Sequence, residues 1–545
     1  MRSSKKSVWM LSLLLLLSLV LIAACSNNDG GSSEAPETNA PDDSATGEDD
    51  VVEETTGGDL IIATKSEIVG LDPHTSNDVP SSNIAYNIYE SLVYFDENDE
   101  LQPLLAESWD QIDELTLEFT LKQGVKFHDD TDFNAEVVKA NIERILDPAT
   151  ASQRLFLYEM VTEVNVIDEY TVQIVTEYPF APLLPHLAHS AGGMISLDAI
   201  EKDREAVASG QNPGSHISSN PVGTGYFKFD YWTTGEEVKL VRNDNYWGEH
   251  AKVDSVTFKV VGEELTRLTE LETGYVHIAE QMQPSDITRI QGLPNAGLNE
   301  TPQTSLSYIA FNTQKEPFTD VRVRQAISMA IDPAQIIDGI LYGAGIPAVG
   351  PLAQSVLGYD ASVTPLEYDI EGAKALLAEA GYADGFSTTI WTNDSATRVQ
   401  TAEYLQSALR ELNIDVSVEI VEWATYLEDT SAGKHDMFIL GWSTPTSDAD
   451  YAMYALFHSK NHGSTGNRTF LTDAELDDLL DRGRQEVDPD ARLAIYKEAQ
   501  ERLVEIAPMV YTHYTILLTG ISDSVHDFWV TPNGIFRLQN VYISE

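Results

Sequence analysis

The segment 441–451 combines aromatic, hydroxyl and acidic residues in a way that suits a ligand-binding loop. It reads Gly-Trp-Ser-Thr-Pro-Thr-Ser-Asp-Ala-Asp-Tyr and follows an apolar predicted strand. Ligands of open α/β folds bind at loops that leave the carboxyl ends of strands. Trp442 offers a flat apolar wall, or plain core packing as the alternative, and Thr444 offers a hydroxyl. Asp448 or Asp450 offers a carboxylate for a cationic group of the ligand.

Two arginines are candidates for holding an anionic ligand. Arg398 opens a predicted helix after the strand 388–391, and Arg154 lies in the loop-to-helix region 150–158. A guanidinium fork binds a carboxylate through two parallel hydrogen bonds. The alternative for Arg398 is a surface charge, but the helix macrodipole disfavours a cation at a helix N-terminus. Because the chain has 33 Lys and Arg against 87 Asp and Glu, an arginine in a cleft is scarce.

Metal ligation and catalysis are the competing chemistries. His458 and His462 are four residues apart. His435 and His513 lie in the same region. Gly463 and its polar neighbours argue against a helix that would place the first pair on one face. The chain contains neither a Gly-x-Ser-x-Gly nor a His-Glu-x-x-His motif. We therefore expect no enzyme, no cofactor and no directly bound metal, with a chelated metal and a secreted hydrolase as alternatives.

The strong negative charge excludes several classes of partner. The formal net charge is −54 at pH 7, whereas proteins that bind nucleic acids or anionic lipids need a basic surface. Surface carboxylates keep an exposed protein soluble in a salty or alkaline medium, which is the function that we expect for them. A calcium loop is not expected, because 447–450 lacks the glycine and the distal glutamate of that motif.

The N-terminus predicts export and anchoring. A basic start precedes an apolar run, and Ala23-Ala24 stand before Cys25, the only cysteine in the chain. This order is typical of a bacterial lipoprotein signal peptide over residues 1–24, with Cys25 as the lipidated residue. A membrane helix is the alternative, but the apolar run is short for a bilayer span. Residues 25–58 are acidic and poor in bulky apolar residues, which predicts a disordered linker.

Strands and helices alternate along the rest of the chain. Predicted strands cover 59–64, 115–121, 171–175, 256–261, 307–312, 388–392, 416–420 and 435–442. Predicted helices cover 82–94, 134–146, 320–330, 370–380 and 401–412. This alternation predicts mostly parallel sheets covered by helices. Because single cores stop growing near roughly 250–300 residues, we expect two or three domains.

Several motifs, in order along the chain, resemble the solute-binding proteins of peptide- and nickel-type ABC importers (family 5). The motifs are GVKFHD at 124–129, NPVGTGYFKF at 220–229, VRNDNYWG at 241–248, YIAFN at 308–312 and PFTDVRVRQAISMAID at 317–332. Asp130 stands where this family usually has glycine. Gly223 and Gly225 predict a tight turn in which side chains would clash. The resemblance runs from about residue 59 to the end of the chain.

The resemblance implies an α/β, two-lobed periplasmic-binding-protein type II fold with an extra inserted domain, of the large cluster C type. Lobe I would be built from 59–98, 218–305 and 521–545, inserted domain II from 99–217, and lobe III from 306–520. A ligand is then enclosed as the lobes close around a hinge. The implied partners are a small peptide ligand, a membrane permease and a cytoplasmic ATPase, with the protein itself a monomer.

The same resemblance narrows the ligand. In dipeptide and oligopeptide binders of this family, an aspartate three residues after the Gly-Trp tryptophan anchors the ligand's α-ammonium, but Pro445 stands there. The segment 441–450 is instead similar to the glutathione-type branch. Arg398 resembles an arginine that grips a peptide carboxylate, and Arg154 resembles one used for anionic ligands in the nickel branch. We expect a lipid-anchored, extracytoplasmic protein that captures small peptides, with a nickel or metal-chelate binder as the alternative.

Overall fold

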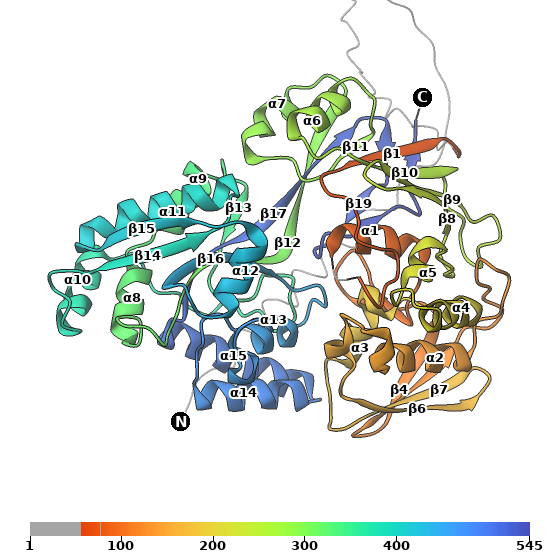
Figure 1. Cartoon of the computed structure of the whole chain (residues 1–545), viewed down its shortest axis with the longest axis horizontal. Helices are drawn as coiled ribbons and strands as arrows, with labels where there is room; N and C mark the ends of the chain where they lie inside the picture. The colour runs from red at the N-terminus through yellow and green to blue at the C-terminus, as the bar shows by residue number, and fades with distance from the viewer. Residues whose placement is uncertain (1–55, 77, 545) are drawn as a thin grey trace, which may run out of the picture. The chain divides into compact units, whose positions relative to one another are not determined.

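Two long antiparallel strands cross the centre of the main sheet (Figure 1). The computed structural model describes residues 56–76 and 78–544. In it, β12 (Ala296–Phe311) and β17 (Met509–Ser522) pair along most of their length. The carboxyl half of β12 also pairs with β16 (Met437–Ser443), and the carboxyl end of β17 pairs with β11 (Ile278–Ala279). The two strands therefore join the strands on the β16 side of the sheet to those on the β11 side.

The main sheet has eleven strands, and the strands outside its centre are shorter. On the β16 side lie β14 (Ser387–Thr392), β15 (Asp415–Ile420) and β13 (Gly345–Pro347), which pairs with β17. Beyond β11 follow β1 (Asp59–Thr64), β10 (Ser255–Val260), β9 (Glu237–Arg242) and β8 (Phe227–Thr233). Three small pairs are β2 (Val93–Phe95) with β3 (Leu101–Pro103), β18 (Val525–His526) with β21 (Tyr542–Ile543), and β19 (Trp529–Val530) with β20 (Phe536–Arg537).

The pairing of β12 with β17 is interrupted at the middle of both strands. The register shifts between Pro302 and Leu306, and again between Ser307 and Tyr308. Proline has no N–H to donate to a strand ladder, and a bulge bends the strand that carries it. The hydrogen-bond ladder between the two strands is therefore irregular in the middle of both.

A separate four-stranded antiparallel sheet lies in residues 106–176. Its order is β4 (Ala106–Asp113), β5 (Thr116–Leu121), β7 (Thr171–Thr176) and β6 (Val161–Asp168). Helix α2 (Ala135–Leu146) begins at Asn134, whose side chain accepts hydrogen bonds from the N–H groups of Glu136 and Val137. Alternate residues of β5 and β7 and one face of α2 are buried in one core, which includes Phe119, Ile142 and Val172.

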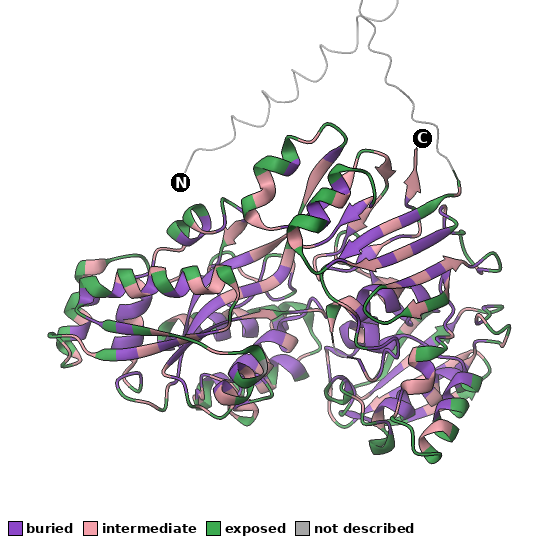
Figure 2. Ribbon diagram, turned by 45° about the horizontal axis from the view of Figure 1, so that its top comes forward, coloured by how far each residue is buried: buried purple, intermediate pink, exposed green. Residues whose placement is uncertain are grey.

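The remaining helices cover the faces of the sheets, and Figure 2 shows their outward sides exposed and the strands largely buried. In the first half of the chain they are α1 (Val79–Ile88), α3 (Leu183–Ala188), α4 (Leu197–Ala208), α5 (Ser215–Ser219), α6 (Glu264–Glu272) and α7 (Ile287–Gln291). In the second half they are α8 (Val321–Met329), α9 (Pro333–Gly339), α10 (Ile370–Glu379), α11 (Ala396–Leu409), α12 (Trp423–Ser431), α13 (Ala449–Phe457), α14 (Ala474–Gln485) and α15 (Pro489–Ile506).

The prediction of mostly parallel sheets is wrong. Among the strands that the structure describes, only β1 with β10 and β11, and β14 with β15 and β16, pair in parallel. Neighbouring strands such as β8, β9 and β10 are joined antiparallel, and so are β12 and β17. A local alternation of strands and helices does not reveal which strands lie side by side, because that depends on contacts between distant segments.

The helix predicted over 82–94 ends at Ile88, because Tyr89 takes an extended conformation. The carbonyl of Ile88 accepts the N–H of Gly225 at 2.9 Å. A Cβ at Gly223 would lie 2.1 Å from the same carbonyl oxygen. The turn predicted at Gly223 and Gly225 therefore packs against the end of α1 and needs glycine there.

The predicted signal peptide, the predicted lipidation site Cys25 and residues 26–55 of the predicted linker lie outside the described residues. Among the residues that the structure does describe, no helix is long and apolar enough to cross a lipid bilayer.

Candidate functional site

Two neighbouring cavities lie where segments from distant parts of the chain meet. The large cleft cavity, of about 520 Å³, is lined by Gln153, Phe156, Glu159, His186, Trp442, Asp450, Tyr451, Tyr454, Ala455, Asn461, Ser464, Thr465, Arg468 and Arg484. The small cleft cavity, of about 160 Å³, is lined by Asp78, Val79, Ser82, Tyr86, Arg154, His189, Ser190, Ser443, Pro445, Tyr451, Asn533 and Ile535. Tyr451 lines both. The larger volume is within the range of roughly 300–1,000 Å³ that is usual for ligand sites.

Segments that are distant in the sequence contact each other around the two cavities. The side-chain amide of Asn533 donates to the carbonyl of Pro445 at 3.0 Å. The N–H of Ala181 donates to the carbonyl of Arg484 at 3.0 Å. The rings of Phe156 and Tyr451 lie 5.8 Å apart. A ligand in either cavity would therefore be enclosed by segments on both sides of the cleft.

Trp442 lies near the end of β16, after the buried apolar run Met437–Leu440. Its ring packs against Tyr451 with the ring centroids 6.1 Å apart, and it lines the large cleft cavity. Its Nε1 is buried and has no hydrogen-bond partner among the described residues. A buried donor without an acceptor is costly. The position suits the predicted ligand wall, since a bound ligand could accept this hydrogen bond.

The two candidate aspartates of the segment are both held in buried ion pairs. Asp448 caps α13 and accepts two hydrogen bonds from Arg492, both of 2.7 Å. Asp450 accepts hydrogen bonds of 3.0 and 3.1 Å from Arg484. Burial opposes the charge of Arg484, but Asp450 raises the pKa of this guanidinium. Asp450 lines the large cleft cavity with its partner, whereas Asp448 lines neither cavity. The sequence suggested that one of these carboxylates would be available to a ligand, but both are paired with an arginine of the protein.

Thr444 is placed by its backbone. Its N–H donates to the carbonyl of Thr304 in β12 at 3.1 Å, and its side chain is buried. Its neighbours Ser443 and Pro445 line the small cleft cavity, but Thr444 lines neither cavity.

Arg154 is buried in the wall of the small cleft cavity. Its Nε donates to the carbonyl of Ser76 at 2.8 Å, and its Nη1 lies 3.4 Å from Nε2 of His189. Its Nη2 has no acceptor, and the guanidinium has no carboxylate within ion-pair distance, among the described residues. Burial lowers the pKa of Arg154, which means that its charge is only partly compensated.

Arg398 lies in the first turn of α11, beside the end of β16. Its Nη1 donates to Oδ1 of Asn393 at 3.1 Å, and its guanidinium carbon lies 5.5 Å from the ring centroid of Trp423. A Cβ at Gly441 would lie 3.9 Å from its Nη2, so the guanidinium approaches the Gly-Trp pair closely. Burial lowers its pKa. Arg398 lines neither cavity, and in the described residues it has no carboxylate partner.

Arg468 is a candidate that the sequence analysis missed. It lines the large cleft cavity, and its Nε is buried without a partner among the described residues. The charges of Arg468 and Arg398 both act to lower the pKa values of Tyr308 and Tyr426, although burial raises these pKa values overall. Two guanidinium groups thus lie near one pair of tyrosines. The scarcity of arginine was the one signal in the sequence that pointed to it.

The four candidate histidines are used by the fold. Nε2 of His435 lies 3.0 Å from the carbonyl of Arg468, and Nε2 of His462 lies 2.8 Å from the carbonyl of Leu471. His458 lies 3.4 Å from a carboxylate oxygen of Asp481. Burial lowers the pKa of His513 to about 4. In the part of the chain that the structure describes, no group of three or more His, Cys, Asp or Glu is placed to hold a metal ion.

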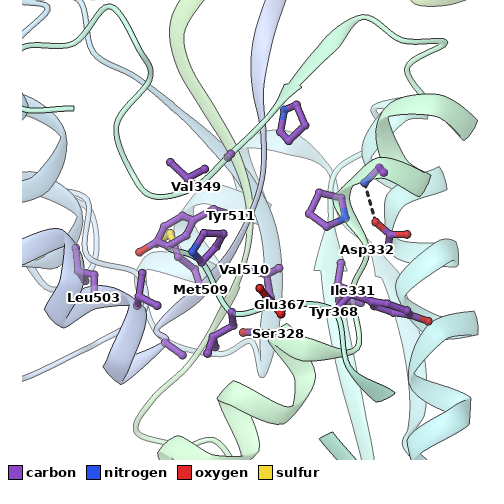
Figure 3. Close-up of a pocket in the computed structure, with 18 residues that line it drawn as sticks. Ser328, Ile331, Asp332, Val349, Glu367, Tyr368, Leu503, Met509, Val510 and Tyr511 are labelled. Carbon is purple, nitrogen blue, oxygen red and sulfur yellow. Dashed lines mark hydrogen bonds between the residues drawn. The ribbon is translucent and has the colours of Figure 1, made fainter. Parts of the chain in front are cut away.

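A further cavity, of about 350 Å³, lies beside β13, the end of α15 and the start of β17 (Figure 3). Its walls are mainly apolar and include Val349, Leu503, Met509 and Val510, and it shares no lining residue with the two cleft cavities. The cleft cavities are the better candidates for a polar ligand, because their walls carry the unpaired cationic groups.

Comparisons with known proteins agree with this architecture. The sequence profile of the bacterial extracellular solute-binding proteins, family 5 Middle, matches residues 100–464. The glutathione-binding protein GsiB of Shigella flexneri is 32% identical over 491 residues, which cover 88% of this chain and 94% of that protein.

Solved structures show the same fold. The ABC transporter-associated periplasmic binding protein DppA of Helicobacter pylori, in complex with the peptide STSA, has a TM-score of 0.78 and 30% identity, over 90% of this chain and 99% of that one. NikZ of Campylobacter jejuni, in complex with Ni(L-His), has a TM-score of 0.76 and 24% identity, over 87% of this chain and 97% of that one.

These matches confirm the expected two-lobed α/β fold and the expected family. The relatives are binding proteins, and the expectation that the chain is not an enzyme is confirmed with them. The chain therefore belongs to the bacterial extracellular solute-binding proteins of family 5, and it is a solute-binding component of an ABC importer.

Proposed function

We propose that this protein captures a small anionic peptide, with glutathione as the foremost candidate, and delivers it to a membrane permease driven by a cytoplasmic ATPase. The observation that carries the proposal is a set of three arginines that we call the cleft arginines. Arg154 and Arg468 line the two cleft cavities, and Arg398 lies beside Gly441, next to the wall residue Trp442. None of them has a carboxylate partner among the described residues, although the chain has 87 acidic residues. A ligand with two carboxylates would supply the missing partners.

Pro445 supports a ligand other than an ordinary dipeptide. Proline has no carboxylate and no backbone N–H, so it cannot anchor an α-ammonium as an aspartate would. Its carbonyl is already bonded to Asn533. The similarity to the glutathione-binding protein GsiB points the same way. Trp442, Asp450 and Arg484 would form the wall of the large cleft cavity, whereas Asp448 and Thr444 would act through the scaffold.

A metal chelate is the second candidate, supported by the structural likeness to NikZ. Free guanidinium groups repel a bare Ni²⁺ ion but accept a carboxylate of a chelator. This alternative therefore requires an anionic carrier for the metal, and it uses the same arginines.

Titration calorimetry with the full-length protein tests the two candidates against each other. The panel is glutathione, α-linked di- to pentapeptides, and nickel with and without histidine. We expect glutathione to bind and to stabilise the fold by about 2.7 kcal/mol at a hundredfold excess over Kd. Tight nickel binding with no response to any peptide would contradict the proposal, and so would equal affinity for long peptides of any sequence.

We also propose that Cys25 is lipidated, which would place the protein on the outer face of the cell membrane as a monomer. The support is the lipobox-like order before this cysteine. Cys25→Ser should release the protein into the medium or leave an uncleaved precursor. Wild-type protein found lipid-free in the medium, with a mature end well downstream of Cys25, would overturn this proposal.

The domain division proposed is lobe I from 59–98, 218–305 and 521–545, domain II from 99–217 and lobe III from 306–520. The separate four-stranded sheet within 106–176 supports domain II. The interruption of β12 between Pro302 and Leu306 supports a hinge near 305.

A further inference from the structure

The small cleft cavity holds one carboxylate and one guanidinium among otherwise neutral groups. Asp78 and Arg154 line it, together with hydroxyl, amide and apolar side chains. His189 also lines it, but burial and the charge of Arg154 hold the pKa of this imidazole well below its usual range. The cavity therefore presents one negative and one positive charge to whatever enters it.

One oxygen of Asp78 is occupied and the other is not. Oδ1 accepts the N–H of Ser81 at 2.8 Å and so caps α1. Oδ2 is buried and has no hydrogen-bond partner among the described residues. A buried carboxylate oxygen without a donor costs free energy, which a cationic group of a ligand would recover.

Arg154 is held by a backbone carbonyl that is close to Asp78 in the sequence. Its Nε donates to the carbonyl of Ser76, two residues before Asp78, while its Nη2 has no acceptor among the described residues. The hydrogen bond to Ser76 thus holds Arg154 in the wall of the cavity that Asp78 also lines. The charge of Asp78 also acts on Arg154, although no ion pair forms between them.

We propose that the small cleft cavity binds a free α-amino-acid head, in which an ammonium and a carboxylate sit on one carbon. The ammonium donates to Oδ2 of Asp78, and the carboxylate accepts from Nη2 of Arg154. A cavity of about 160 Å³ suits a single residue of a peptide better than a whole peptide. This inference rests on the proposed function and deepens it.

Such a site distinguishes γ-linked from α-linked peptides. The first residue of an ordinary peptide has a free ammonium, but its carboxylate is consumed in the peptide bond. A γ-glutamyl residue keeps both groups on its α-carbon, as in glutathione. Asp78 would thereby replace the ammonium anchor that Pro445 cannot supply. The rest of the ligand would pass Tyr451 into the large cleft cavity, where its other carboxylate would meet Arg468.

Two analogues of glutathione test the two halves of the site by titration calorimetry. Glutaryl-Cys-Gly lacks only the ammonium, and 4-aminobutyryl-Cys-Gly lacks only the α-carboxylate. We expect wild type to bind each at least about 30-fold more weakly than glutathione. Asp78→Asn should bind glutathione and glutaryl-Cys-Gly with similar affinity, and Arg154→Ala should not distinguish glutathione from 4-aminobutyryl-Cys-Gly.

The variant Asp78→Asn keeps the helix cap, because asparagine caps helices as well as aspartate. Asp369→Asn is the matched control, since Asp369 caps α10 in the same way and lines neither cleft cavity. If Asp78→Asn binds glutathione as tightly as wild type, or if wild type binds glutaryl-Cys-Gly as tightly as glutathione, the amino-acid site is wrong while the proposed function stands. If wild type binds none of the three compounds, the proposed function fails, and the inference that rests on it fails too.

Discussion

The protein uses its buried arginines in two contrasting ways. Arg144 donates to Asp72 at 2.6 Å and to Asp203 at 2.9 Å, and all three side chains are buried. Arg484 and Arg492 are paired with Asp450 and Asp448 in the same manner. At the cleft, Arg154, Arg398 and Arg468 have no such partner among the described residues. The chain has 87 acidic residues, so a shortage of carboxylates does not explain why these three arginines are unpaired.

A missing carboxylate alone does not identify a binding residue. Arg267 and Arg324 also lack one, but their guanidinium groups are satisfied by backbone carbonyls, among them those of Glu280 and Val261 for Arg267. The cleft arginines differ because some of their donors have no acceptor in the part of the chain that the structure describes. A free donor in or beside the wall of a cavity, rather than burial or charge alone, therefore separates a binding arginine from a structural one.

The largest effect on stability should come from a paired arginine. Arg144→Ala leaves the carboxylates of Asp72 and Asp203 buried without a countercharge, which should lower the free energy of unfolding by about 3–5 kcal/mol. Denaturant unfolding measures this change. Arg289→Ala is the control, because Arg289 forms a half-exposed ion pair with Glu272. An equally small loss for both variants would break the distinction between the two classes.

The unpaired arginines should show the opposite pattern. Arg398→Ala and Arg468→Ala should each weaken a carboxylate ligand by about 2–5 kcal/mol if the pair with the ligand is buried. Their free energies of unfolding should hardly change, because no carboxylate is left unpaired. Calorimetry and denaturant unfolding of the same samples separate the two effects. Loss of stability without loss of affinity would place these residues in the structural class.

Glu280 is a buried carboxylate near Arg267, one of the structural arginines. Burial raises the pKa of Glu280 to about 7, although Arg267 opposes the shift. The folded state thus keeps a proton that the unfolded state loses near pH 4.5, and the stabilisation is present at low pH and lost as pH rises toward 7. The loss amounts to about 3 kcal/mol.

Denaturant unfolding of wild type and of Glu280→Gln from pH 4.5 to 8 tests this shift. The quantity to compare is the free energy of unfolding of wild type minus that of the variant at each pH. We expect the difference to become less favourable to wild type across this range. Taking the difference removes the contribution of the buried histidines, whose lowered pKa values act in the opposite direction. A difference that does not change with pH would show that Glu280 is ionised in the folded protein.

The smallest effect concerns the surface. If the excess carboxylates repel one another, the melting temperature should rise between low and moderate sodium chloride, because salt screens exposed charges. The buried pairs of arginine and aspartate should contribute little to this change in melting temperature, because salt screens buried pairs much less. A flat or falling melting temperature would contradict the explanation by self-repulsion, and stabilisation by calcium alone would point to ion binding.

The sequence allowed much of the fold to be predicted, but less of the site. The helix predicted over 134–146, the strand predicted over 115–121 and the tight turn predicted at Gly223 depend on neighbours in the chain, and all three are present. The partners of Asp448 and Asp450 lie 44 and 34 residues away, and no local pattern reveals such pairs. For the same reason the antiparallel centre of the main sheet was not predicted.

Asp78 shows why the candidate site was only partly predictable. In the sequence it has the features of an ordinary helix cap, which it is. Its second oxygen becomes notable only because folding brings Arg154 and Pro445 to the same cavity. Arg154 and Trp442, by contrast, were identified from the sequence. Arg154 resembles an arginine of the nickel branch and is a scarce cation in an acidic chain, and Trp442 belongs to a segment that leaves the carboxyl end of a predicted strand.

The central claim is that the cleft arginines are kept unpaired for a small anionic peptide. Mass spectrometry of the ligand released from freshly purified full-length protein tests it most directly. We expect a small peptide with more carboxylates than amines, of the mass of glutathione, and we expect it to be absent from the Arg154→Ala/Arg468→Ala double variant. A metal chelate without peptide, a mixture of long peptides, or the same ligand retained by the double variant would contradict it.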